Sequence, residues 1–170
     1  NVHILDNAPR YRPGSTYEQR KLLFRNTTSR RFVEVGRLAG SAFAAMKVSR
    51  GLAIGDIDND GDLDLLVNNN GQDAELLRND AANRRHALIV QLRGAAPNRD
   101  AVGARVTVTS GGRTQIRDVR AGSSYLSQND LRVHVGLGDA TMAERIEVRW
   151  PSDRIENVGN VAADQIVTIE

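Results

Sequence analysis

The chain has 170 residues and a formal net charge of +2, so it is neither strongly acidic nor strongly basic. Hydrophobic residues make up 40% and charged residues 26%, which suits a folded domain with its own core. Cysteine is absent, which excludes disulfides and a cysteine nucleophile. Apolar runs are all shorter than a transmembrane helix requires, so no membrane span is predicted.

The basic residues form short clusters, such as Arg30-Arg31 and Arg84-Arg85, and not one long stripe. Aromatic residues that could stack on bases are not interleaved with these clusters. We therefore predict that the clusters are solvated loop residues and that nucleic acid is not a partner.

The N-terminal segment, residues 1–20, is polar and contains two prolines and a glycine, which disfavour a helix. It is predicted to be a loop or an extended segment. Short strands are expected over 22–26 and 31–35, and a loop rich in small residues over 36–47. The sequence begins without an initiator methionine or a signal peptide, which suggests a processed chain or a fragment.

The stretch from residue 56 to residue 64 contains five aspartates in nine residues. Carboxylates held this close repel one another without a counter-charge. Calcium takes roughly 6–8 oxygen ligands, and loops with alternate aspartates and a glycine turn supply them. The spacing therefore predicts a calcium site whose ligands are the side chains of Asp56, Asp58, Asp60 and Asp64 and the backbone carbonyl of Asp62.

An EF-hand is the obvious competitor for this loop, and it is rejected. An EF-hand needs a bidentate glutamate at position 12 and a helix on each side, whereas position 12 here is Val67. The flanks, 51–55 and 63–67, are apolar runs of strand length, so the loop is predicted to join two strands. A solvated turn without a metal is the remaining alternative, and it is disfavoured because such turns need one or two of these residues.

The loop lies between the two copies of a short internal repeat. The run Leu23-Phe24-Arg25-Asn26 recurs about 50 residues later as Leu76-Leu77-Arg78-Asn79, and that spacing is on the scale of a propeller blade. A preceding blade is predicted to end at Asn26, and a full blade to run from about Arg31 to Asn79. The asparagine-glycine run over 68–71 is a turn signal between two strands of that blade.

Residues 50–67 resemble the FG-GAP/VCBS type of repeat, which forms one blade of an integrin-like β-propeller. In that family a D-x-D-x-D-G-x-x-D loop binds calcium between the first two strands of the blade, so the resemblance implies Ca²⁺ at the five aspartates. A lone blade leaves strand edges unpaired and an apolar face uncovered. The expected partners are therefore other propeller blades of a larger chain or other copies of this chain. If the 170 residues are the whole mature protein, we expect self-assembly into an oligomer or filament.

The character of the chain changes after Asn79. Residues 80–85 are predicted to be a linker, and beyond it apolar and polar positions alternate with a period of two, which indicates strands with one buried face. Six or seven short strands are expected, including those over 86–93, 104–109, 113–119, 131–135, 146–150 and 165–169. Glycine-rich turns separate them, which favours a β-sandwich.

This second half resembles the ASPIC/UnbV domain, which follows FG-GAP repeats in secreted, cartilage-acidic-protein-like chains and in many exported bacterial proteins. The matching segments are 97–106, 122–128, 136–138 and 148–152. Two positions depart from the family pattern: Val135 replaces a common phenylalanine, and Asp153 replaces a glycine. The first change is a core swap and the second a turn change, so neither affects the assignment.

Together these observations predict an all-β chain in which one integrin-type β-propeller blade is followed by a β-sandwich. Residues 1–26 are assigned to a leading segment and the end of a preceding blade. Residues 27–80 are assigned to the FG-GAP/VCBS blade with its calcium loop, and residues 81–170 to the ASPIC/UnbV sandwich.

Catalytic residues are not predicted anywhere in the chain. The three histidines are scattered without zinc-ligand spacing, and Gly136-Leu137-Gly138 lacks the third glycine and the helix of a dinucleotide site. Ser127, Asp130 and His134 are close in sequence, but a triad depends on geometry that sequence does not give. His134 is expected to be an exposed strand residue opposite Arg132.

A loop over 123–130 carries the residues most suited to ligand contact, namely Tyr125, Gln128 and Asn129. The alternative is that this loop only packs against the end of the sandwich. Trp150 is predicted to lie in the core, with a platform for a sugar ring as the alternative.

The predicted function is that of an exported, calcium-stabilised, non-catalytic module for binding or assembly, through protein–protein contact or self-association. The alternative is a carbohydrate-binding accessory module of a larger extracellular enzyme, with a glycan as its partner. A calcium site of roughly 0.1–1 mM affinity fills only where calcium is abundant. The expected location is therefore extracellular, on the cell surface or periplasmic.

Overall fold

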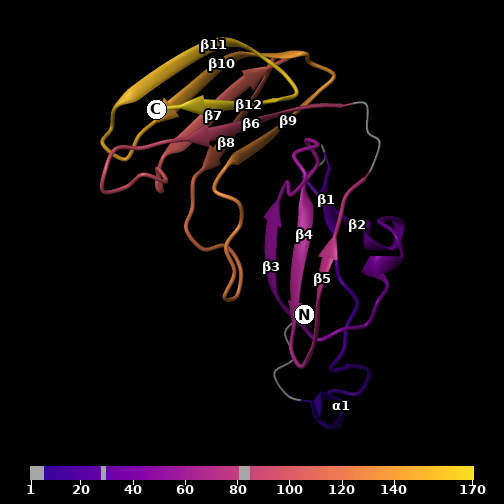
Figure 1. Cartoon of the computed structure of the whole chain (residues 1–170). Helices are drawn as coiled ribbons and strands as arrows, with labels where there is room; N and C mark the ends of the chain where they lie inside the picture. The colour runs from indigo at the N-terminus through magenta and orange to yellow at the C-terminus, as the bar shows by residue number, and fades with distance from the viewer. Residues whose placement is uncertain (1–5, 28–29, 81–84) are drawn as a thin grey trace. The chain divides into compact units, whose positions relative to one another are not determined.

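The structure is a computed structural model that describes residues 6–27, 30–80 and 85–170 (Figure 1). Strands dominate these residues, as the sequence predicted, so the chain is all-β. The helical elements are each one turn long: α1 (Ala8–Tyr11) and the 3-10 helices η1 (Gly36–Leu38) and η2 (Ser41–Phe43). Within the described ranges, none of them is long and apolar enough to cross a membrane.

The chain divides into two compact units. The first contains Asn1–Leu52 and Leu65–Leu77, and the second contains Ala53–Asp64 and Arg78–Glu170. The aspartate-rich loop therefore belongs to the second unit, together with the whole C-terminal part of the chain. The linker predicted over 80–85 lies largely outside the described residues.

The first unit contains one small sheet and most of a second, because the boundary between the units falls within β3, after Leu52, and at the start of β4, after Asp64. Strands β1 (Phe24–Asn26) and β2 (Phe32–Glu34) form an antiparallel pair. A second sheet has three strands in the order β3-β4-β5, and its strands are β3 (Ser49–Gly55), β4 (Asp64–Asn69) and β5 (Gln72–Leu77). The predicted asparagine-glycine turn joins β4 to β5, and Gly71 takes a φ of 66° there, which glycine adopts without strain.

The strands between about Arg31 and Asn79 fall in two sheets, because β2 pairs with β1 while β3, β4 and β5 form a separate sheet. The assignment of this range to one blade stays a prediction. One expectation for the first unit needs correction. The predicted loops contain single helical turns. Pro9 is compatible with α1 because it lies in the first turn, where its missing N–H has no helical partner.

The apolar side chains of the first unit are poorly covered. Val48 and Val67 are its buried hydrophobic residues among those that the structure describes. The exposed large hydrophobic residues include Leu22, Leu23, Phe24, Phe32, Val33, Leu38, Met46, Leu66 and Leu76. Ion pairs join its segments instead, with Arg20 2.9 Å from Glu34 and Lys21 2.9 Å from Glu75.

The second unit contains seven further strands in two sheets. They are β6 (His86–Leu92), β7 (Arg105–Ser110), β8 (Arg113–Asp118), β9 (Val133–Gly138), β10 (Met142–Arg149), β11 (Ile155–Ala162) and β12 (Gln165–Ile169). One sheet has the order β11-β10-β7-β8, and the other has the order β12-β6-β9. In the three-stranded sheet β12 runs parallel to β6, and β9 runs antiparallel to it.

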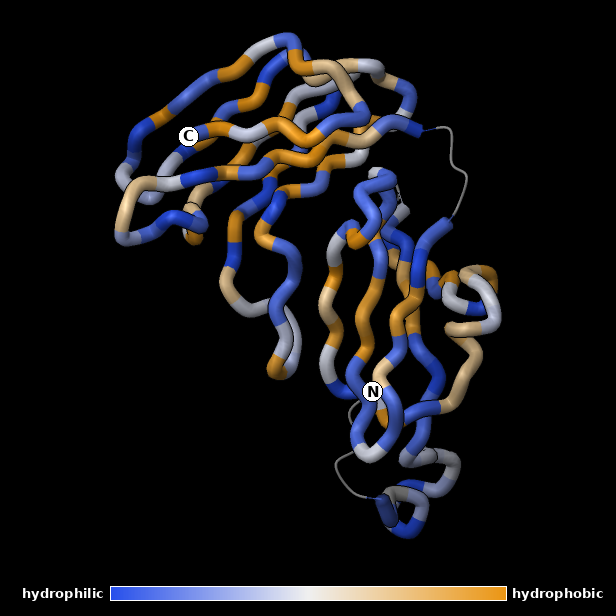
Figure 2. Tube along the Cα trace, viewed as in Figure 1, coloured by the Kyte–Doolittle hydropathy of each residue, from blue (hydrophilic) through white to orange (hydrophobic). Residues whose placement is uncertain are grey.

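Both sheets of the second unit contribute to one hydrophobic core. Hydrophobic and hydrophilic residues alternate along strands such as β7, whereas β6 contains a continuous apolar run (Figure 2). The core side chains that are almost completely buried include Leu88, Val90, Val106, Val108, Val135, Ile146 and Val148. Burial of about 25 cal/mol per Å² of apolar surface makes this core the main stabilising feature of the unit.

Strand β11 was missed by the sequence analysis. It lies at the edge of its sheet, and it is mostly exposed, with a glycine and several polar residues. Asn160 takes a φ of 54° in the middle of it, a conformation that interrupts a regular strand pattern. An exposed edge strand needs no buried stripe, so the period-two signal is weak here.

Candidate metal site

The aspartate-rich loop joins the end of β3 to the start of β4, as predicted. Two residues in it take left-handed backbone conformations: Asn59 with a φ of 59° and Gly61 with a φ of 94°. Asparagine and glycine are the residues that tolerate this region best. The chain reverses at these two positions, and the reversal turns the side chains on either side of it toward one another.

Asp56 begins the loop and is 4% exposed. Its two carboxylate oxygens accept hydrogen bonds from the backbone N–H groups of Asp60 at 3.2 Å and Gly61 at 2.9 Å. These bonds hold the turn closed across the left-handed residues. Each oxygen has a second lone pair, so the carboxylate can still bind a cation.

Asp64 ends the loop and is 1% exposed. Its carboxylate accepts hydrogen bonds from the N–H of Ile57 at 2.9 Å and from the N–H of Asn79 at 2.8 Å. Asn79 is the last residue of the repeated Leu-Leu-Arg-Asn run. The second copy of the repeat therefore ends at a residue whose backbone N–H is hydrogen-bonded to the last aspartate of the loop.

Three of the predicted ligands meet at one point. Asp56, Asp58 and Asp64 each offer a carboxylate oxygen, and these oxygens all lie within 4.8 Å of one another. Asp58 is exposed, whereas its two neighbours are buried. A cation placed among these oxygens would therefore have one solvent-facing side.

The other two predicted ligands lie to one side of this group. Asp60 belongs to a second, exposed group with Asp58 and Asp80, whose oxygens also lie within 4.8 Å of one another. Asp62 is half-buried, and its N–H donates to the Asp60 carboxylate at 2.9 Å. Asp80 was not predicted from sequence, because it lies beyond the loop and nothing in its local pattern marks it.

The hydrogen bonds described above for the two buried carboxylates all come from backbone N–H groups. Arg78 lies on the exposed side, 2.6 Å from Asp80 and 3.9 Å from Asp58. Its hydrogen bond to Asp80 raises the pKa of the Arg78 guanidinium above its ordinary value.

The donor set suits a hard divalent cation. Each atom offered by the two groups is a carboxylate oxygen, and such oxygens are preferred by calcium and magnesium over softer metals. Burying two like charges without a partner is unfavourable, and a divalent cation would remove that penalty. The residues present therefore fit a calcium ion at the point where Asp56, Asp58 and Asp64 converge.

Sequence reasoning missed two side chains that contact the loop from a distant segment. Arg132 donates to the backbone oxygen of Asp56 at 2.7 Å, and His134 Nε2 donates to the backbone oxygen of Gly61. His134 was expected to be exposed, but it is half-buried and lies opposite Ile89 of β6. More than 70 residues separate each pair along the chain, so no local pattern could have revealed them.

The residues predicted to contact a ligand differ in their surroundings. Tyr125 is 65% exposed. Gln128 is bound within its own loop, accepting from the N–H of Gly122 at 2.6 Å and donating to the carbonyl of Arg120 at 3.1 Å. Asn129 is also engaged, because its side-chain oxygen accepts from the N–H of Ile54 at 3.0 Å.

Ser127, Asp130 and His134 do not form a triad. Ser127 donates to the carbonyl of Tyr125 at 2.9 Å, and Asp130 accepts from Arg132 at 2.6 Å. Neither is hydrogen-bonded to His134 in the described structure. The proximity of these three residues in sequence is therefore not accompanied by catalytic geometry.

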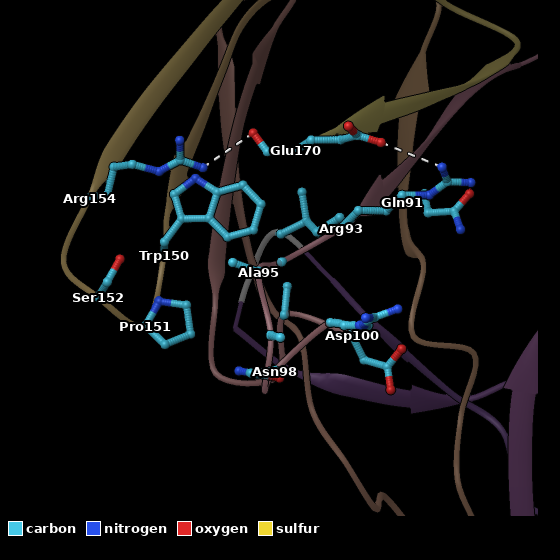
Figure 3. Close-up of a pocket in the computed structure, with 15 residues that line it drawn as sticks. Gln91, Arg93, Ala95, Asn98, Asp100, Trp150, Pro151, Ser152, Arg154 and Glu170 are labelled. Atoms are coloured by element: carbon cyan, nitrogen blue, oxygen red, sulfur yellow. Dashed lines mark hydrogen bonds and ion pairs between the residues drawn. The ribbon is translucent and has the colours of Figure 1, made fainter.

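A cavity of about 970 Å³ lies at another edge of the second unit (Figure 3). Residues from 91–101 and 150–154 line it, together with Glu170. Trp150 forms part of its wall but is 5% exposed and belongs to the core, as predicted. Its indole N–H donates to Glu156 at 3.2 Å.

Two arginines that line this cavity are bound to Glu170. Arg93 donates to the Glu170 carboxylate at 3.4 Å, and Arg154 donates to the Glu170 backbone oxygen at 3.2 Å. The Arg154 guanidinium also lies over the Trp150 ring, 4.8 Å from its centre. Among the described residues that line the cavity, no histidine or cysteine is present to serve as a base or nucleophile.

Comparison with known protein families gives one match. Residues 94–170 match the family model described as ASPIC and UnbV. The match covers the region in which the sequence motifs pointed to this family, so that resemblance is confirmed. The curated proteins contain no match to the chain.

Proposed function

Residues 94–170 form an ASPIC and UnbV domain, and from this premise we propose that the chain is an exported, calcium-stabilised, non-catalytic binding or assembly module. In this proposal residues 27–80 are an FG-GAP/VCBS blade and residues 81–170 are a β-sandwich. The shared core of the two sheets in the second unit supports the sandwich, and the β3-β4-β5 sheet with its loop supports the blade.

One observation carries the calcium assignment. Asp56 and Asp64 are buried, and each offers a carboxylate oxygen within 4.8 Å of the other and of Asp58, so three negative charges converge at one point. Such an arrangement is unfavourable unless a positive charge is bound. Calcium would supply that charge and would accept oxygen ligands in this flexible geometry.

The residues around the loop suit a structural role for the metal. Asp56, Asp58 and Asp64 would hold the ion, and Asp60 and the carbonyl of Asp62 complete the set proposed from the sequence. The nearby imidazole of His134 is engaged by the Gly61 carbonyl oxygen. No nucleophile paired with a free base adjoins the loop in the described residues, so we assign the metal to stability.

The exposed apolar side chains of the first unit support the assembly part of the proposal. Leu66 and Leu76 are exposed and adjacent as cross-strand partners on β4 and β5, and contiguous exposed apolar surface marks interaction sites. Other propeller blades or other copies of the chain would cover them, and strand addition at open sheet edges is a natural joint. If the site has an affinity of roughly 0.1–1 mM, it fills only where calcium is abundant, which supports the proposal that the protein is extracellular, on the cell surface or periplasmic.

Glycan binding is kept as a second candidate because of one residue, Tyr125, whose ring is exposed. The other aromatic candidate, Trp150, offers no free face in the same way, because Arg154 covers its ring. An assembly module should bind nothing on a glycan array, whereas an accessory module should show binding that Tyr125→Ala removes.

The calcium proposal is tested by thermal melts of the whole chain. With a dissociation constant of about 0.1 mM, 1 mM calcium adds about 1.4 kcal/mol of stability by mass action. That is expected to raise the melting temperature by about 3–6 °C relative to EGTA for a chain of this size. Identical melts, together with no metal by elemental analysis, would contradict the proposal.

Two variants distinguish a side chain that is proposed to bind the metal from one that only lies beside the site. Asp58→Asn removes an exposed ligand, so the fold should survive while calcium affinity falls by about tenfold or more, because a ligating charge is lost. Asp62→Ala is the matched control, since only its carbonyl is proposed to bind, and it should change the affinity by less than about threefold. Isothermal titration measures both. If Asp62→Ala proved the more damaging change, the ligand register would be wrong.

A further inference from the structure

The shape of the metal loop is set partly from outside the loop, by residues 129–134. Arg132 Nη2 donates to the Asp56 backbone oxygen at 2.7 Å, and Nη1 donates to the Asn59 side-chain oxygen at 2.6 Å. His134 Nε2 donates to the Gly61 backbone oxygen. The loop is therefore held at its first, fourth and sixth positions by two side chains of the second unit.

The strand that leads into the loop is held by the same segment. The N–H of Ile54 donates to the Asn129 side-chain oxygen at 3.0 Å, and the N–H of Asp130 donates to the Ile54 carbonyl at 2.9 Å. Both backbone groups of Ile54 are thus taken by adjacent residues of the 129–134 segment. The segment and the loop are joined at two places, one before the aspartates and one among them.

Arg132 is itself fixed and charge-compensated by Asp130. Its Nε donates to the Asp130 carboxylate at 2.6 Å, and its backbone N–H donates to the other oxygen of the same carboxylate at 2.9 Å. A planar guanidinium held in this way presents its remaining N–H groups in fixed directions. The Asp130 charge also offsets the positive charge of Arg132, so the pair can lie beside a cation site with little repulsion.

The contacts fall on the parts of the loop that are hardest to order. Asn59 and Gly61 are the left-handed residues, and fixing a residue in one backbone conformation is entropically unfavourable. Arg132 holds the side chain of Asn59, and His134 holds the carbonyl of Gly61. A loop ordered before the metal arrives binds that metal more tightly, because less ordering remains to be done.

We propose that the 129–134 segment is a positioning element for the metal loop, with Arg132 as its principal residue, so that calcium binding and docking of the loop on this segment form one coupled equilibrium. Arg132 is not a metal ligand and acts through the backbone of Asp56 and the side chain of Asn59. By linkage, whatever docking adds to calcium affinity, calcium adds to docking. This inference rests on the calcium binding proposed above.

The test compares calcium affinity in the full chain and in Arg132→Gln by isothermal titration. Loss of two hydrogen bonds to the loop is expected to weaken calcium binding about tenfold. Arg145→Gln is the matched control, because Arg145 also bonds a carboxylate two residues away, Glu147, but on β10 away from the loop. That control should leave the dissociation constant within about twofold.

A second readout separates positioning from general destabilisation. In the wild type, calcium should slow hydrogen exchange at the amides of Ile54 and Asp130, whose bonds report docking. In Arg132→Gln this calcium-dependent protection should shrink. Asp58→Asn, alone and combined with Arg132→Gln, completes a double-mutant cycle. Where calcium is not bound, Arg132→Gln can change hydrogen exchange only through its structural effect.

A milder variant covers the case in which Arg132→Gln fails to fold. Asn59→Gly keeps a residue that accepts the left-handed conformation and removes the oxygen that Arg132 Nη1 contacts. It should weaken calcium binding about threefold. If the wild type binds calcium but both variants bind within twofold of it, this inference is wrong and the proposed function stands. If the wild type binds no calcium, the proposed function fails and the inference fails with it.

Discussion

The two units of the chain differ in how they use their hydrophobic residues. The second unit buries its apolar side chains in one core shared by two sheets. The first unit buries two hydrophobic residues, Val48 and Val67, among those described, and exposes at least four times as many large hydrophobic residues, aliphatic and aromatic together. Both contain alternating strands, so the pattern of the sequence does not explain the contrast.

An alternating pattern along a strand determines which face of its sheet is apolar. A hydrophobic core forms only where a second layer covers that apolar face. In the second unit the chain supplies both layers itself. The β3-β4-β5 sheet and the β1-β2 pair of the first unit are small, and ion pairs such as Arg20–Glu34 tie their segments together. The second unit is therefore expected to carry most of the stability measured for the isolated chain.

The strongest test of this comparison is truncation of the core. Ile146 of β10 is fully buried, so Ile146→Ala should destabilise the second unit by about 3–4 kcal/mol through lost burial and a residual cavity. Denaturant unfolding followed by the fluorescence of Trp150, the single tryptophan, reports this unit directly.

Ile116→Ala is the matched control for Ile146→Ala. Ile116 lies on β8 in the same sheet but is 55% exposed, so its truncation should change stability by less than about 0.5 kcal/mol. Leu76→Ala in the first unit should also fall below about 0.5 kcal/mol by this probe. A loss at Leu76 as large as that at Ile146 would mean that the units do not differ in the way described.

The second test concerns association through the first unit. Leu66 of β4 and Leu76 of β5 are cross-strand partners, and both are exposed. Replacing them together by Leu66→Lys and Leu76→Glu preserves the net charge and allows a cross-strand ion pair. The wild-type chain is expected to associate at micromolar concentration, and the double variant to shift toward a monomer, as light scattering would show.

A matched change in the second unit controls for surface charge. Ile116→Lys with Ile155→Glu alters two exposed isoleucines and keeps the net charge, so association should be unchanged. A wild-type chain that stays monomeric at micromolar concentration would contradict the assembly proposal. Association that survives in the Leu66/Leu76 variant would place the contact elsewhere on the chain.

Much of the second unit could be predicted from sequence, for a physical reason. Strands β6 and β12 coincide closely with the predicted ranges. In β7 and β9 the buried residues alternate with more exposed ones, which is the signal that a period of two detects. Strand β11 could not be predicted, because an edge strand is stabilised by backbone pairing with β10 more than by burial. Local alternation measures burial, so it detects inner strands better than edges.

The candidate site could likewise be predicted only where a local sequence pattern determines its geometry. The aspartate spacing brought Asp56, Asp58 and Asp64 together correctly, because a loop of nine residues constrains its own side chains. Asp60 and Asp80 form a neighbouring group, which the loop spacing alone does not give. The contacts of Arg132 and His134 depend on how the aspartate loop and the 129–134 segment meet within the second unit. These segments are more than 70 residues apart, so no local sequence pattern indicates that they meet.

The smallest expected effect is an acid response confined to the first unit. The hydrogen bonds of Arg20 to both Glu34 oxygens, with a further bond from the Gly36 N–H, hold the pKa of the Glu34 carboxyl below its ordinary value of 4.5. A lowered pKa means that the stabilisation is fully present above pH 4.5 and is lost as the pH falls through the folded-state value.

Glu34→Gln removes the charge, so it should speed exchange of the β1–β2 amides at pH 7 by at most about fivefold. Below the folded-state pKa the wild type should approach the variant, once exchange is corrected for its intrinsic pH dependence. Amides of β6 and β10 in the second unit should not respond to the substitution at any pH. A gap between wild type and variant that stays constant from pH 7 to pH 3 would show that the Arg20–Glu34 pair does not stabilise the first unit through its charge.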